Sequence, residues 1–112
     1  MELKSSKGSL IELVISSDEL KDLSALLLLS QENTRVMRDA DVNEEDIVYF
    51  LEQLKAASQF LLKVSLDDIN KLYSLVWTIG VKGIILNGTG VTEARLEELD
   101  STILSIQTQA TK

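Results

Sequence analysis

The sequence predicts an all-α protein: a single small bundle of about four main helices, with a short helix or extended segment before them. Three observations predict this fold class. The 112 residues include no proline, so nothing along the chain removes an amide donor or breaks a helical turn. Apolar residues recur at intervals of three and four through most of the chain. Residues that suit helix N-caps precede four of these stretches.

We expect one domain over residues 1–112, with mobile polar tails at 1–8 and 107–112. Apolar residues make up 45% of the chain, which is enough for a core, and aromatic residues only 4%, so aliphatic side chains must build that core. The sequence shows no apolar leader segment and no run of the ~20 apolar residues that a membrane-spanning helix needs. These features predict a soluble, cytoplasmic protein.

The residue types that are absent restrict the possible chemistry. The chain has no histidine and no cysteine, which removes the commonest general base, the commonest metal ligand and the thiol nucleophile. The formal net charge of −7 disfavours direct binding to nucleic acid or to an anionic membrane. The charge suits instead a protein partner with a basic patch. We therefore expect neither an enzyme nor a cofactor.

Residues 9–15 are ambiguous. Their β-branched content permits a strand, whereas Ser9 and Glu12 have the spacing of a capping box. Because no other stretch is recognisable as a partner strand, a short helix or an extended lead-in is the favoured interpretation.

The first main helix is predicted to begin at Ser16, because Ser16 and Glu19 form a capping-box pair. A broad apolar stripe follows at helical spacing, formed by Leu20, Leu23, Leu26, Leu27 and Leu29. After polar residues 31–34 the helix continues or restarts towards Ala40.

The second main helix is predicted to begin at Asn43, with acidic residues in its first turn and apolar residues at helical intervals as far as Leu62. The third should be capped by Ser65, with Asp68 three residues later. It is predicted to continue to Leu86 and to end in the sequence Asn-Gly-Thr-Gly at 87–90.

The last helix should begin after Thr92. Its apolar residues are spaced three, four and three apart, as in a heptad repeat, and form what we call the C-terminal seam: Leu96, Leu99, Ile103 and Ile106. Packing within the chain is the first interpretation of this seam, and contact with a second copy or a partner helix is the alternative.

Trp77, Gly80 and Gly83 lie together in the third predicted helix. Each glycine costs about 1 kcal/mol relative to alanine inside a helix. Close approach of another backbone or a bulky side chain would explain them best, a kink is second, and an end of the helix near Ile79 is third. Trp77 is most simply a core residue, although a partly exposed tryptophan beside small residues would anchor a partner.

An acidic cluster precedes and begins the second main helix; it consists of Asp39, Asp41, Glu44, Glu45 and Asp46. Asp39, Asp41 and Asn43 match the start of a calcium-binding EF-hand loop. The match then fails, because Glu44 stands where the loop needs glycine and Phe50 where it needs glutamate. A solvated loop and helix start is the favoured interpretation, and a docking surface for a basic partner is the alternative.

Two weaker signals are given structural interpretations. Asp67 and Asp68 could be paired acid and base carboxylates, but they occupy a helix first turn, where the helix dipole favours aspartate. The glycines at 88 and 90 lack the lysine and the spacing of a phosphate-binding loop.

Taken together, these features predict a non-enzymatic protein–protein interaction module that uses apolar helical seams: a small adaptor, assembly or structural subunit that forms oligomers. The candidate partner-binding residues are Asp39, Asp41, Glu44, Glu45, Asp46, Trp77, Gly80, Gly83, Leu96, Leu99 and Ile103. The alternative is an acidic inhibitor, of the immunity type or mimicking nucleic acid, that covers a basic surface on its target. Ionic strength separates the two, because it weakens electrostatic contacts and not apolar ones.

Overall fold

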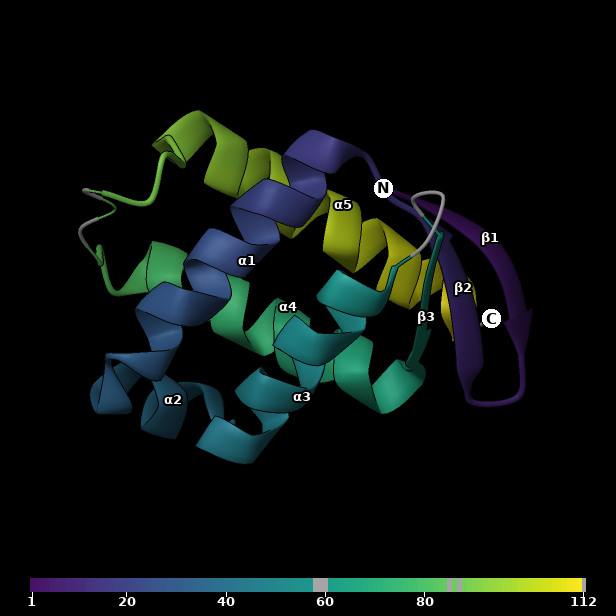
Figure 1. Ribbon diagram of the computed structural model, residues 1–112, viewed down its shortest axis with the longest axis horizontal. Helices are drawn as coiled ribbons and strands as arrows, with labels where there is room; N and C mark the ends of the chain where they lie inside the picture. Colours follow the sequence, from purple (N-terminus) through teal and green to yellow (C-terminus); the bar gives the residue numbers. More distant parts are fainter. Residues whose placement is uncertain (58–60, 85, 87, 112) are drawn as a thin grey trace.

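The computed structural model of the chain describes residues 1–57, 61–84, 86 and 88–111. Within these residues, three strands and five helices follow one another along the chain. They are β1 (Glu2–Lys7), β2 (Leu10–Val14), α1 (Ser17–Gln31), α2 (Thr34–Ala40), α3 (Glu44–Ala56), β3 (Leu61–Ser65), α4 (Leu66–Val81) and α5 (Glu93–Ala110). The sheet occupies one end of the molecule and α2 lies towards the other (Figure 1). The fold therefore combines helices with a sheet, and the prediction of an all-α helical bundle is wrong.

The three strands form an antiparallel sheet in the order β1-β2-β3. A two-residue turn joins β1 to β2, and its first residue, Gly8, has φ +62°. A glycine at that turn position is typical of the type II′ hairpin, whose twist matches that of the strands. The backbone oxygen of Ser9 also accepts a hydrogen bond of 2.8 Å from the amide of Leu66, which fixes the hairpin to the start of α4.

Residues 9–15 are extended and not helical, because the side chains of β2 alternate between two environments. Ile11 and Leu13 are fully buried, while Leu10 is 51% exposed. The partner strand β3 shows the same alternation, with Leu62 and Val64 buried. The sequence interpretation assigned Leu62 to the preceding helix, because apolar residues recur at helical intervals from Leu54 to Leu62, and so it found no partner for β2.

Regular secondary structure extends into both terminal segments. Residues 1–8 contain β1, a mostly polar strand whose backbone pairs with β2. Local composition cannot reveal this strand, because its stabilising hydrogen bonds come from β2. At the other end, α5 continues as far as Ala110.

The predicted helix starts are confirmed at Ser16, Asn43, Ser65 and Thr92, each of which accepts a hydrogen bond from a backbone amide three residues later. At the first three of these positions, the residue three places on bonds back to the cap, which completes a capping box. The sequence left open whether the first helix continues or restarts after residues 31–34. It restarts as α2, where Asn33 caps the helix by accepting from the amide of Val36.

The end of α4 was predicted at Leu86, five residues too late. The helix ends at Val81, and Gly83 follows in a left-handed conformation with φ +62°. The amide of Ile84 donates to the oxygen of Ile79 at 3.2 Å, and that of Gly83 donates to Gly80 at 3.3 Å. These two bonds define a Schellman motif, which needs a left-handed residue at the position of Gly83. The expected cap at residue 87 lies outside the described residues.

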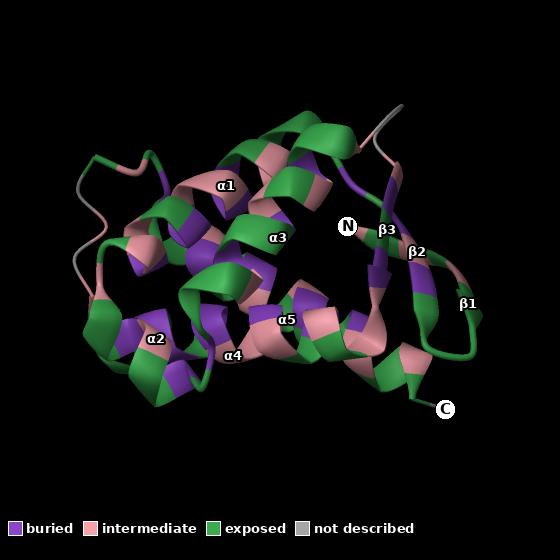
Figure 2. Cartoon of the chain, turned by 60° about the horizontal axis from the view of Figure 1, so that its bottom comes forward, coloured by how far each residue is buried: buried purple, intermediate pink, exposed green. Residues whose placement is uncertain are grey.

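One core joins the sheet to the helices, and buried residues face inward from several elements (Figure 2). Helix α4 is central to it, packing against α5, α2 and β3. Its buried residues are aliphatic except for Thr78, and the aliphatic ones are Ile69, Leu72, Leu75, Val76 and Ile79. This arrangement fixes the positions of α4 and α5 relative to each other, and with them the candidate site.

Candidate functional site

A surface groove with a volume of about 420 Å³ lies between α4 and α5. We call it the α4–α5 groove. It is lined by four residues of α4 and four of α5: Val76, Trp77, Gly80, Val81, Leu96, Glu97, Asp100 and Ser101. Both helices begin at well-defined caps and contact each other extensively, so the groove is built on rigid elements.

Gly80 lines the groove and adds no side chain to it. Val76 and Leu96 are buried beneath it, and a Cβ atom added at Gly80 would lie 3.8 Å from Cδ2 of Leu96. That distance is ordinary van der Waals contact. The side chain of Leu96 therefore approaches Gly80, but not so closely that the position requires glycine.

Two large apolar side chains of α4 are exposed beside Gly80. Trp77 is 51% exposed and Val81 is 59% exposed. They are four residues apart on α4 and so are neighbours on one helix face. Trp77 is therefore not a core residue, as the first interpretation had it. It does lie beside Gly80 on α4.

Carboxylates line the α5 side of the groove. Glu97 is exposed, and Asp100 is partly buried. One side-chain oxygen of Asp100, Oδ1, is inaccessible to solvent and has no hydrogen-bond partner among the described residues. Burial raises the pKa of the Asp100 carboxyl above its ordinary value. The α4–α5 groove therefore pairs an apolar wall with an acidic one.

The C-terminal seam packs inside the chain. Leu96, Leu99 and Ile103 are buried, and only Leu96 also lines the groove. Gly83 lies at the end of α4 and lines an adjacent hollow of about 210 Å³, which shares Gly80, Leu96 and Glu97 with the groove. The structure thus brings Trp77, both glycines and Leu96 into one surface region, and it leaves Leu99 and Ile103 in the core.

The acidic cluster is divided among different local roles. Asp39 lies 3.5 Å from Nζ of Lys82 and 3.9 Å from Nε of Arg38. Asp46 accepts a 2.9 Å hydrogen bond from Nζ of Lys71, which lowers the pKa of that carboxyl. Both acids are therefore held by cations of the same chain.

The other three members of the cluster are exposed. Asp41 follows α2 with φ 57° and ends it with the same pattern of bonds as Gly83, since the amides of Asp41 and Val42 donate to Arg38 and Met37. Glu44 and Glu45 stand in the first turn of α3, where the helix dipole favours negative charge. Among the described residues, no three acidic side chains converge as a metal site requires.

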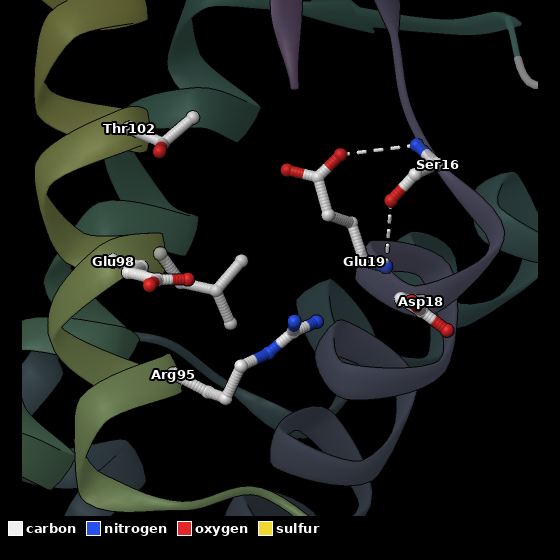
Figure 3. A pocket seen from close by; sticks show the side chains of 7 residues that line it. Ser16, Asp18, Glu19, Arg95, Glu98 and Thr102 are labelled. Carbon is white, nitrogen blue, oxygen red and sulfur yellow. Dashed lines mark hydrogen bonds between the residues drawn. The ribbon is translucent and has the colours of Figure 1, made fainter.

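A second cavity, of about 210 Å³, lies between the start of α1 and the middle of α5 (Figure 3). Three of its polar residues bond to each other or to neighbours. Ser16 and Glu19 form the capping box of α1, and Glu19 also accepts from the amino group of Met1. Burial alone would raise the pKa of Glu19, but these hydrogen bonds outweigh it and lower the pKa. Arg95 reaches across from α5 to Asp22. These three residues of the cavity therefore have structural roles.

Four residues of the α4–α5 groove were not singled out in the sequence: Val81, Glu97, Asp100 and Ser101. One signal could have found the acidic pair. Glu97 and Asp100 each directly follow a seam residue, Leu96 and Leu99, so both lie at the edge of the buried helix face.

Comparisons with known proteins add no relative. No protein-family model, curated protein or solved structure matched the chain. In the part of the chain that the structure describes, no helix is both long enough and apolar enough to cross a membrane.

Proposed function

We propose that this protein is a non-enzymatic interaction module that binds a segment of another protein in its α4–α5 groove. The observation that carries the proposal is the exposure of Trp77 and Val81 beside an open hollow. Tryptophan is enriched among the residues that dominate binding energy, because one rigid side chain covers a large apolar area. The absence of cysteine is typical of a reducing compartment, so we place this activity in the cytoplasm.

The shape of the groove supports a protein segment as its occupant. It is open to solvent on its outer side and has an apolar floor formed by Val76 and Leu96. An apolar side chain of a partner could enter the space above Gly80 and contact Trp77. Burying half of a tryptophan side chain on binding would contribute about 1–2 kcal/mol by removal of apolar area from water.

Site-specific photo-crosslinking in the cells that make the protein tests this proposal. A photoreactive residue replaces Val81 at the groove or, as the matched control, Leu28 on α1, which is similarly exposed. We expect a discrete adduct from position 81 that excess unlabelled protein prevents and that Trp77→Ala removes. Identical adducts from positions 28 and 81, or an adduct insensitive to Trp77→Ala, would contradict the proposal.

The acidic inhibitor is retained as a second candidate, supported by one specific observation. Asp41, Glu44 and Glu45 are exposed, and the ion pairs of the described residues do not include them. If they cover a basic surface, the complex should dissociate in about 0.5 M salt, where the Debye length falls to roughly 4 Å. A complex in which the partner binds in the α4–α5 groove and contacts Trp77 should persist at that salt concentration.

Self-association is a further part of the proposal, since exposed apolar residues could equally contact a second copy. Sedimentation of the wild type and of Trp77→Ala tests it. A dimer that depends on Trp77 would identify the groove as the contact, and a monomer at all concentrations would remove self-association.

A further inference from the structure

We infer that the α4–α5 groove selects a partner segment carrying an arginine, whose guanidinium stacks on Trp77 and bonds to Asp100. The inference rests on the proposed function and specifies the chemistry of the partner. It follows from three features of the groove: a carboxylate without a partner among the described residues, the aromatic face opposite, and the engagement elsewhere of the cations in the described parts of α4 and α5.

The carboxylate is the first feature. Oδ1 of Asp100 is shielded from water and accepts no hydrogen bond among the described residues. Leaving a buried acceptor unpaired is unfavourable, and the loss is greater for a charged group. The buried acceptor is not the one that a ligand would reach: a donor that enters the groove can bond the other carboxylate oxygen, Oδ2, and so stabilise the charge of the group. The raised pKa of Asp100 is consistent with a carboxylate that lacks such a donor.

The aromatic face is the second feature. Trp77 borders the same groove as Asp100 and Glu97. A guanidinium can stack on an indole ring while its N–H groups point outward to carboxylates. Glu97 is three residues before Asp100 on α5, so the two are neighbours on that helix and offer acceptors to one cation. Lysine fits less well, because its ammonium cannot combine stacking with a planar fork of donors.

The third feature is that the cations on these helices are engaged elsewhere. Lys71 contacts Asp46 and Asp67, Lys82 contacts Asp39, and Arg95 contacts Asp22. In the described parts of α4, α5 and the residue that caps α4, no other lysine or arginine occurs. The acidic side of the groove therefore has no partner within its own helices, and the net charge of −7 would attract a basic segment.

A pair of peptides tests the inference. The first is a blocked pentapeptide of sequence Ala-Leu-Arg-Leu-Ala, and the second has neutral citrulline in place of arginine. Binding is followed by NMR through the indole N–H of Trp77, which is unique because the chain has one tryptophan. We expect the arginine peptide to shift this signal and to bind about tenfold more tightly than the citrulline peptide.

Matched variants distinguish a specific effect of the groove on binding from the effect of the general negative charge of α5. Asp100→Asn removes one negative charge within the groove, and Glu98→Gln removes one from α5 outside it. Asp100→Asn should abolish the preference for arginine, whereas Glu98→Gln should preserve it. The amide spectrum of each variant away from the groove verifies that the fold is intact.

The outcomes distinguish failure of the inference from failure of the proposed function. Equal binding of both peptides at Trp77, or a preference that survives Asp100→Asn, overturns the arginine assignment and leaves a groove that binds proteins. If neither peptide perturbs the Trp77 signal, the arginine assignment is also overturned. If, in addition, no crosslink forms from position 81, the proposed function fails as well. A Trp77 signal that moves with protein concentration alone identifies a second copy as the occupant and overturns the inference.

Discussion

Arg95 on α5 donates two hydrogen bonds to a single carboxylate oxygen of Asp22 on α1, one of them from Nε at 2.9 Å. The two residues are 73 positions apart in the sequence. Asp22 is almost fully buried, and proximity to its carboxylate raises the pKa of Arg95 further above its ordinary value. This pair holds the start of α5 against α1 on the side of α5 away from the groove.

Arg95→Gln should therefore destabilise the protein more than Arg35→Gln, which removes an exposed arginine from α2. The reason is that the first substitution leaves the buried carboxylate of Asp22 without its partner, and the second leaves nothing unpaired. Urea unfolding followed by circular dichroism measures both. Adding Asp22→Asn to Arg95→Gln should recover part of the loss, as coupled residues do in a double-mutant cycle. Equal midpoints for Arg95→Gln and Arg35→Gln would show that the pair contributes nothing.

Gly80, inside α4, and Gly83, just after its end, should respond in opposite ways to alanine. Gly80→Ala places a methyl group at ordinary contact distance in a helix interior and should stabilise the protein by about 0.5–1 kcal/mol. Gly83→Ala forces a side chain into a left-handed conformation and should destabilise it by about 1 kcal/mol. Thermal unfolding of the two variants checks the signs. Two shifts of the same sign would contradict the Schellman ending of α4.

The ion pair between Asp46 and Lys71 should give a stability that depends on pH. The hydrogen bond from Lys71 lowers the pKa of Asp46 below its ordinary 3.8, so its contribution is present above that pH and is lost on acidification. The hydrogen bonds to Asp46 and then to Asp67 raise the pKa of Lys71 above its ordinary 10.5, so its contribution is present below that pH and is lost on alkalinisation. Asp46→Asn should therefore cost stability between these limits and little beyond either one.

The size of this effect should be that of an exposed pair, about 0.2–1 kcal/mol. Unfolding free energies measured across the pH range give the profile. Glu45→Gln is the matched control, because it removes a charge from the same helix turn without breaking an ion pair. If both variants gave the same profile, the effect would belong to the helix dipole and not to Lys71.

The alternation of β2 can be tested by two leucines. Leu13→Ala removes a fully buried side chain and should cost about 2–5 kcal/mol, whereas Leu10→Ala removes an exposed one and should cost within about 0.5 kcal/mol. In a helix, residues 10 and 13 would share one face and have similar environments. Comparable losses on urea unfolding would therefore argue against the strand.

Much of the candidate site could be anticipated, and the reason lies in local sequence. Trp77 and Gly80 are three residues apart on one helix, so their proximity follows from helical geometry alone. Asp100 could not be paired with Trp77 in this way. The packing of α5 on α4 places it there, and that packing depends on the whole buried seam.

The acidic cluster shows what local sequence cannot predict. Its five residues are close in sequence, but their charges are not equivalent in the fold. Lys71 of α4 pairs with Asp46, and Lys82, which caps α4, pairs with Asp39, while Glu44 keeps its exposed charge. Counting charges along the chain cannot show which of them a distant lysine reaches.

The sequence by itself determined where helices begin. Ser16, Asn43, Ser65 and Thr92 act as caps because each side chain bonds an amide three residues away, and that chemistry is complete within one turn. The tertiary structure alone decided the sheet, the exposure of Trp77 and the pairing of Arg95 with Asp22. Strands need hydrogen bonds from distant partners, and burial depends on which surfaces meet, so neither is encoded within a short stretch of chain.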